Sequence, residues 1–188
     1  MRTILVITFG ALLACAAFAV EVGKPSPALT IQRINGPALQ LSQYKGKVVA
    51  LALIDTNCPH CQNLTKVLNV ISKDYAAKGV QFLGCAFNDN VKSLLPDFLQ
   101  KFQPTFPVGY CDRDAIMAYV QYSVLKPFYV PHMVFLDRRG VVRGDFAGES
   151  DFMTAPDVNV RTELDQLLKG GTTTTTSTSA AAHTAHKQ

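Results

Sequence analysis

Two cysteines separated by two residues are the part of this sequence best suited to covalent chemistry. The motif reads Cys58-Pro59-His60-Cys61, and such a pair can close and open a disulfide at one helix terminus. If a helix begins at Pro59, a residue favoured at the first helical position, Cys58 meets unsatisfied N–H groups and the positive end of the helix dipole. Both favour thiolate over thiol, and a protonated His60 would add to the effect. The motif therefore predicts thiol–disulfide exchange, with Cys58 attacking and Cys61 resolving.

The same spacing occurs in zinc sites, where two such pairs supply four thiolates. This chain has no second Cys-x-x-Cys, and Cys85 and Cys111 each stand alone. We therefore expect no metal and no other cofactor. Free buried cysteine is common in protein cores, so core packing is one interpretation of Cys85 and Cys111. A second disulfide between them is the other.

The motif lies between a predicted strand and a predicted helix. Residues Lys47–Ile54 form a short, nearly continuous apolar run, typical of a strand buried on both faces of a sheet. Apolar residues then recur at helical spacing from Pro59 to Lys78, and Gly79 is placed to end that helix. A second apolar strand is predicted over Val80–Phe87. Strand, helix and strand make a right-handed parallel unit.

The rest of the chain predicts one α/β domain over residues 22–169, with a mixed sheet and helices on both faces. We expect helices over Val91–Phe102 and Asp114–Tyr122, and a last one through Val160–Leu168. Strands over Met133–Leu136 and Val141–Phe146 form a hairpin around Asp137–Gly140. Ala28–Ile34 and Ala38–Leu41, around Asn35-Gly36, predict a small N-terminal hairpin.

The first 19 residues are typical of a cleaved export signal, with Arg2, an apolar stretch and the A-x-A sequence Ala17-Phe18-Ala19. Two other interpretations remain. Leu12-Leu13-Ala14-Cys15 resembles a lipoprotein signal in which Cys15 carries a lipid, and the uncharged stretch is about long enough for an uncleaved anchor. All three interpretations place the remaining chain in the periplasm or cell envelope, where disulfides persist.

The other end of the chain predicts disorder. Residues 170–188 are rich in Thr, Ser and Ala and lack apolar periodicity, so they cannot bury enough surface to offset the entropy of ordering. Elsewhere the charges are scattered and the net charge is only +4. This pattern indicates neither a nucleic-acid partner nor a polybasic membrane surface.

Several stretches, in order, carry a resemblance to a known family. They are VGKPSPAL from Val22, LSQYKGKVVAL before the motif, FLGCAFND after the first helix, Phe106-Pro107-Val108, and VPHMVFLDRRGVV. With them the chain resembles the thioredoxin superfamily, specifically exported thioredoxin-like redoxins of the TlpA/ResA type. The resemblance implies that Pro131 follows a cis peptide bond and faces the cysteine pair, and that the backbone of Val130 pairs with a bound peptide. It also implies client proteins with thiols or disulfides, such as apocytochrome c, and a membrane redox partner.

The sequence departs from that family at three positions near the motif. Thioredoxins carry a buried Asp where this chain has Ala52, ResA-type proteins often carry a Glu where it has Leu64, and the usual Trp is Asn57. Those acids exchange a proton with the buried sulfur. The candidates left for this task are Asp55, His60 and His132.

Two other functions compete with disulfide exchange. Peroxiredoxins share the N-terminal half of the pattern, but they have Thr three residues before the reactive cysteine, where this chain has Asp55, with Thr56 one residue later. The other alternative is a non-catalytic binding module on a thioredoxin fold, in which Cys58 and Cys61 form a structural disulfide. The absence of the family's acids is compatible with such a module.

Overall fold

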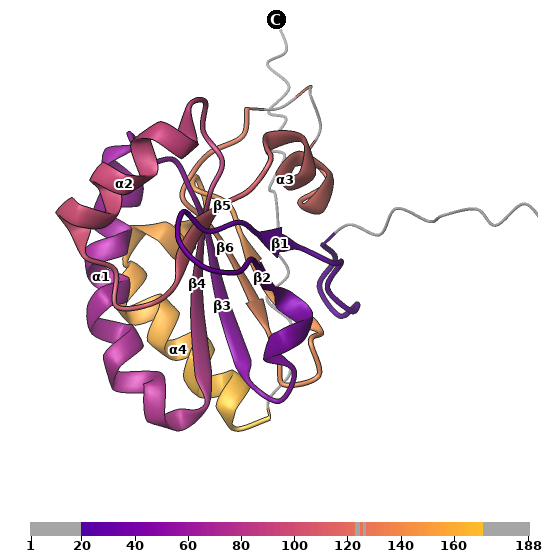
Figure 1. Ribbon diagram of the computed structural model, residues 1–188. Helices are drawn as coiled ribbons and strands as arrows, with labels where there is room; N and C mark the ends of the chain where they lie inside the picture. The colour runs from indigo at the N-terminus through magenta and orange to yellow at the C-terminus, as the bar shows by residue number, and fades with distance from the viewer. Residues whose placement is uncertain (1–19, 123–124, 126, 171–188) are drawn as a thin grey trace, which may run out of the picture.

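A five-stranded mixed sheet forms the centre of the computed structural model, which describes residues 20–122, 125 and 127–170 (Figure 1). The strand order is β5-β4-β3-β6-β7. The strands are β3 (Val48–Ile54), β4 (Val80–Ala86), β5 (Val108–Tyr110), β6 (His132–Leu136) and β7 (Val142–Phe146). β3, β4 and β5 run parallel, whereas β6 and β7 are antiparallel to their neighbours. The predicted mixed sheet is confirmed.

The predicted strand–helix–strand unit forms the middle of this sheet. α1 (Pro59–Tyr75) follows β3 after a short loop, and a 3-10 turn, η2 (Ala76–Lys78), extends it. Gly79 ends the turn with φ of +81°, a conformation that glycine adopts without steric cost. β3 and β4 then pair in register from Val48 opposite Val80. All seven residues of β3 are buried, as expected for a central strand with both faces covered.

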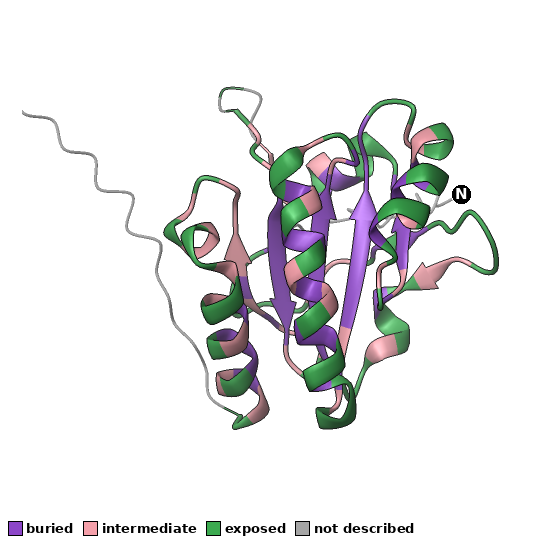
Figure 2. Ribbon diagram, turned by 90° about the vertical axis from the view of Figure 1, so that its left-hand side faces the viewer, coloured by how far each residue is buried: buried purple, intermediate pink, exposed green. Residues whose placement is uncertain are grey.

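Helices cover both faces of the sheet. α1, α2 (Val91–Phe102) and α4 (Pro156–Leu168) pack on one face, and α3 (Arg113–Tyr119) covers the other together with the N-terminal segment (Figure 1). The N-terminal segment comprises β1 (Thr30–Ile31), β2 (Leu39–Gln40) and the 3-10 turn η1 (Leu41–Tyr44), and a further turn, η3 (Asp151–Thr154), precedes α4. Figure 2 looks onto one face of the sheet and shows the buried strands behind helices whose outer surfaces are exposed. The buried apolar side chains therefore form two hydrophobic cores, one on each face of the sheet.

Some boundaries differ from the sequence expectation. The N-terminal hairpin exists, but its strands contain only two residues each. The third helix ends at Tyr119 instead of Tyr122. β5 was not expected, because three residues are too short to show a strand periodicity. Gly109 in β5 allows the N-terminal chain to approach, since a Cβ there would lie 2.1 Å from the carbonyl oxygen of Gln32. The predicted export signal, residues 1–19, and residues 171–188 of the predicted tail lie outside the described residues.

A disulfide joins Cys85 of β4 to Cys111, the residue that follows β5, with their Cα atoms 5.9 Å apart. This separation is normal for a disulfide. The second-disulfide interpretation of these cysteines is confirmed, and the interpretation as free core thiols is wrong. Parallel pairing of β4 with β5 places Cys85 opposite Gly109, two residues before Cys111. The bond therefore fastens the end of β4 to the chain entering α3.

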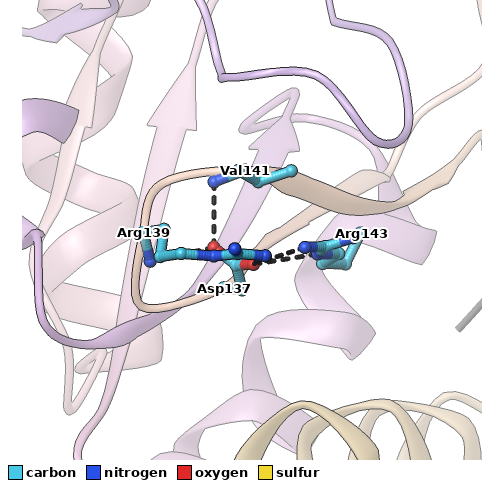
Figure 3. Close-up of polar contacts among 4 residues, drawn as sticks. All are labelled: Asp137, Arg139, Val141 and Arg143. Carbon is cyan, nitrogen blue, oxygen red and sulfur yellow. Dashed lines mark hydrogen bonds and ion pairs between the residues drawn. The ribbon is translucent and has the colours of Figure 1, made fainter. Parts of the chain in front are cut away.

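The β6–β7 hairpin carries the loop before β6, and its turn is held by Asp137 (Figure 3). One carboxylate oxygen accepts hydrogen bonds from the N–H groups of Arg139 (2.9 Å) and Val141 (3.0 Å). The other accepts from Nε and Nη2 of Arg143 at 2.9 and 2.8 Å. Burial alone would raise the pKa of Asp137, but these N–H groups and the guanidinium outweigh it, so the pKa lies below its ordinary value.

We expect Asp137→Asn to lower the free energy of unfolding at pH 7 by about 1–3 kcal/mol, because it removes the charge that Arg143 pairs with. A carboxyl with a lowered folded pKa stabilises the fold above its unfolded pKa, and this contribution is lost as the pH falls through the folded value. Urea unfolding should therefore show a difference between wild type and variant at pH 7 that shrinks below about pH 4. Asp97→Asn, at an exposed position of α2, is the control. Equal stability at pH 7 would contradict the prediction.

Candidate functional site

The two cysteines of the motif occupy very different environments. Cys58 is the N-cap residue of α1 and is partly exposed, whereas Cys61, in the first turn, is completely buried. Pro59 and His60 are the first two residues of the helix, and both are exposed. The predicted helix start is confirmed. Both thiols are free, so the structure describes the reduced pair. Only Cys58 offers its sulfur to a partner without rearrangement.

Cys61 is held from the side of β3. The backbone N–H of Asp55 donates to its Sγ at 3.4 Å. Burial raises the pKa of the Cys61 thiol far above its ordinary value; the N–H of Asp55 opposes this shift, and the neighbouring Cys58 adds to it. The resolving sulfur therefore remains protonated at neutral pH in the reduced protein. When it leaves as a thiolate during exchange, it has a strong tendency to take up a proton.

The segment just before β6, residues 129–131, lies against Cys58 and is called the loop before β6. The bond between Val130 and Pro131 is cis, as the family resemblance implies, and the thiol of Cys58 donates to the carbonyl oxygen of Val130 at 3.8 Å. Gly148, after β7, supports this loop from behind: its N–H donates to the carbonyl oxygen of Tyr129 at 3.3 Å. A Cβ on Gly148 would lie 3.0 to 3.1 Å from Tyr129 and Val130. A small residue at this position lets the loop reach the cysteine.

The chain between β3 and α1 is held by side chains. Thr56 donates its backbone N–H to Oδ1 of Asn88 at 3.0 Å and accepts from Nδ2 of Asn88 at its hydroxyl, also at 3.0 Å. Its carbonyl oxygen accepts from Nε2 of Gln62 at 2.9 Å. Both Thr56 and Asn88 are buried. In the sequence, Thr56 stands out only through its offset from the peroxidase pattern, and Asn88 carries no local signal that would predict this contact.

At the two positions where members of the family carry acidic residues, this chain has apolar residues that are buried. Ala52 is 3% exposed and Leu64 is 3% exposed, both in the core next to Cys61. Of the candidate proton carriers, His60 is exposed in the first turn of α1. Asp55 reaches Cys61 through its backbone, while its carboxylate accepts from the N–H of Asn57 at 2.7 Å. The carboxylate thus holds the loop before the motif.

His132 does not reach the buried sulfur. Side chains alternate along β6, so His132 shares a face with Val134, in the core opposite to that of Cys61. Its Nε2 pairs with Oδ1 of Asp145, and its ring stacks on Phe128 with centroids 5.4 Å apart. The structure therefore places His132 beneath the loop before β6 rather than beside the cysteine pair.

Over the described ranges, no three His, Cys, Asp or Glu side chains form a group that could hold a metal ion. The same part of the chain contains no helix both long and apolar enough to cross a bilayer.

The sheet order, the helix that begins at the cysteine motif and the cis-proline loop against it define a thioredoxin-like protein with a Cys-x-x-Cys site. Solved structures agree on the fold. A thiol:disulfide interchange protein from Chlorobium tepidum TLS has a TM-score of 0.62 at 22% identity, covering 78% of this chain and 99% of that one. A thiol:disulfide interchange protein from Bacteroides sp. has a TM-score of 0.61 at 18% identity, covering 78% and 90%.

The family follows from the sequence match. The AhpC/TSA family model matches residues 22–144, and the chain belongs to this family. The thiol-disulfide oxidoreductase ResA of Bacillus thuringiensis subsp. konkukian is 25% identical over 130 residues, which are 69% of this chain and 72% of the relative. The thiol:disulfide interchange protein DsbE of Pseudomonas fluorescens biotype C is 27% identical over 131 residues, 69% and 68% of the two chains. The resemblance to ResA-type redoxins is confirmed.

Proposed function

We propose that this protein is an extracytoplasmic thiol–disulfide oxidoreductase that exchanges disulfides with client proteins through Cys58 and Cys61. The observation that carries the proposal is the asymmetry of the pair: a partly exposed sulfur at a helix N-terminus and a fully buried one in the same turn. Exchange needs one sulfur that a client can reach and one that is kept from it. The names of the relatives support the same activity.

The reaction requires two displacements. In the oxidising direction, a client thiolate attacks Sγ of Cys58 in the oxidised pair, the Cys58–Cys61 bond breaks, and Cys61 leaves with the electron pair and gains a proton. A second client thiolate then attacks the client sulfur of the mixed disulfide and releases Cys58 as a thiolate. The reverse sequence reduces a client. The raised pKa of Cys61 makes its protonation favourable in the first step.

The loop before β6 is the proposed peptide-binding element. The carbonyl of Val130 lies next to Cys58, and Pro131 fixes the direction of the chain there. An extended client segment can pair with this backbone and bring its sulfur to Cys58. Tyr129 is 48% exposed beside it and supplies an apolar contact for the client.

The proposal includes a cellular setting. We propose that residues 1–19 direct export to the periplasm or cell envelope, that residues 22–169 form the thioredoxin-like domain, and that residues 170–188 are a Thr/Ser/Ala-rich tail outside it. Val20 is buried and its N–H donates to the carbonyl oxygen of Tyr119 at 2.7 Å, so the fold includes the residue just after the proposed cleavage site. Apocytochrome c is a suitable client, and a membrane protein a suitable redox partner.

The test is the reduction potential of the pair, titrated against glutathione in the protein lacking residues 1–19. We expect a reversible two-electron couple above about −270 mV that disappears in Cys58→Ser, while the Cys85–Cys111 bond stays intact in both proteins. The measured value also decides whether clients are oxidised or reduced. A pair that remains oxidised throughout the titration would refute the enzyme and leave a structural disulfide in a binding module.

A further inference from the structure

Asn88 lies outside the cysteine motif, yet it holds the loop that leads into it. β3 ends at Ile54 and α1 begins at Pro59, so the residues between have no strand neighbour to fix them. Within this loop the N–H, the hydroxyl and the carbonyl of Thr56 are all bonded to side chains. Two of these three contacts come from Asn88, and Gln62 supplies the third.

The same loop carries the donor for the resolving sulfur. The N–H of Asp55, the residue just before Thr56, donates to Sγ of Cys61 at 3.4 Å. Two residues after Thr56 is Cys58, whose own N–H donates to the carbonyl oxygen of Asp55 at 3.2 Å. A displacement of Thr56 would therefore move both the Asp55 N–H that donates to Sγ of Cys61 and the backbone of Cys58.

Asn88 is itself held in one place. It is 8% exposed, and its Nδ2 also donates to the carbonyl oxygen of Asp89 at 3.1 Å. The preceding residue, Phe87, extends β4 by donating its N–H to the carbonyl oxygen of Ile54 at 3.2 Å. The Cys85–Cys111 bond fixes the strand three residues earlier. The position of Asn88 is thus set by the end of β4.

We propose that Asn88 is a positioning residue for disulfide exchange: by holding Thr56 it keeps the N–H of Asp55 on the sulfur of Cys61. This inference rests on the proposed function. A thiol or thiolate sulfur accepts a hydrogen bond better than a disulfide sulfur does, so the N–H of Asp55 favours the reduced pair. Loss of the positioning shifts the equilibrium toward the disulfide and makes the protein more reducing.

The experiment compares Asn88→Ala with Asn69→Ala in the glutathione titration and in a stopped-flow measurement of mixed-disulfide resolution. Asn69 is the matched control, because its side chain also bonds two backbone groups, the carbonyl of Phe102 (2.9 Å) and the N–H of Thr105 (3.0 Å), at the far end of α2. We expect Asn88→Ala to shift the equilibrium constant at least fivefold toward the disulfide, about 20 mV, and to slow resolution about tenfold. Asn69→Ala should lose stability but leave the equilibrium constant at its wild-type value.

A second pair of variants tests the contact from the other side. Thr56→Val removes the hydroxyl that Asn88 binds and keeps the backbone N–H, so its shift should have the same sign and be smaller, about twofold. Thr56→Ser keeps both groups and should behave as wild type. If Asn88→Ala does not fold, the comparison of Thr56→Val with Thr56→Ser tests the positioning role in its place.

The possible failures are distinguishable. A wild-type pair without a reversible couple would overturn the proposed function and this inference with it. A reversible wild-type couple that Asn88→Ala leaves unchanged would overturn the positioning role alone, and so would equal shifts in Asn88→Ala and Asn69→Ala, because a general loss of rigidity would then explain both.

Discussion

The Cys61→Ser variant should accumulate a stable mixed disulfide on Cys58, whereas Cys58→Ser should lose exchange altogether. A client can reach the sulfur of Cys58, which is partly exposed. Cys61 is 0% exposed, so its sulfur can attack only a mixed disulfide on the neighbouring Cys58. Without Cys61 the reverse of the first displacement is lost: no internal thiol attacks Sγ of Cys58 in the mixed disulfide to release the client, and the client stays attached. Turnover should fall roughly a thousandfold or more in either variant, as expected when a covalent nucleophile is removed.

Mass spectrometry after incubation with a thiol-containing peptide and oxidised glutathione measures the trapped adduct. Iodoacetamide at pH 8 gives an independent reading: Cys58 in Cys61→Ser should be alkylated, whereas Cys61 in Cys58→Ser should stay unmodified until the protein unfolds. Its burial and its raised pKa both oppose reaction. Rapid alkylation of Cys61 in the folded variant would show that the asymmetry of the pair is absent in solution.

Replacing both Cys85 and Cys111 by alanine should lower the free energy of unfolding by about 3.5 kcal/mol. The bond joins residues separated by 26 positions. In the chain-entropy description, closing a loop of that length lowers the conformational entropy of the unfolded chain, which stabilises the fold by about this amount. Both side chains are buried, so the lost sulfur contacts add to the destabilisation. The loss is a large part of the stability of a domain of this size.

Urea unfolding of the oxidised wild type and the double variant, both in a background that also carries Cys58→Ser and Cys61→Ser, measures the difference. Single variants at Cys85 and Cys111 should each lose nearly as much as the double variant, because either one removes the same bond. The redox activity of the double variant should persist at temperatures well below its melting point, because Cys85 and Cys111 lie in the core on the face of the sheet opposite to Cys61. Equal unfolding midpoints for wild type and double variant would contradict a formed disulfide.

The replacement of the family's acids by Ala52 and Leu64 has a consequence for the reaction. Both positions are sealed in the core beside Cys61, so no side chain there can carry a proton to the sulfur. The N–H of Asp55 is the polar group that the structure brings to Cys61 from this loop. The positioning of that loop, through Thr56 and Asn88, consequently takes on more weight than in relatives with a nearby carboxylate.

Local patterns in the sequence determined much of this molecule. The apolar run before the motif, the proline at the first helical position and the glycine after the helix placed β3, α1 and β4 within about three residues of their observed ends. These features are local because strand burial, helix capping and turn geometry depend on neighbouring residues. The cis bond before Pro131 came from resemblance, since no local rule distinguishes that proline from others.

The environments of the sulfurs were decided by the tertiary structure. Spacing alone could not show that Cys61 is buried while Cys58 is not, nor choose between packing and pairing for Cys85 and Cys111. It also left His132 as a candidate beside Cys61, although β6 turns that side chain to the opposite core. Exposure, hydrogen-bond donors and sulfur–sulfur contacts depend on segments that are distant in the chain and adjacent only after the sheet forms. For this reason the sequence predicted which sulfurs react, and the tertiary structure decided their exposure and their hydrogen-bond partners.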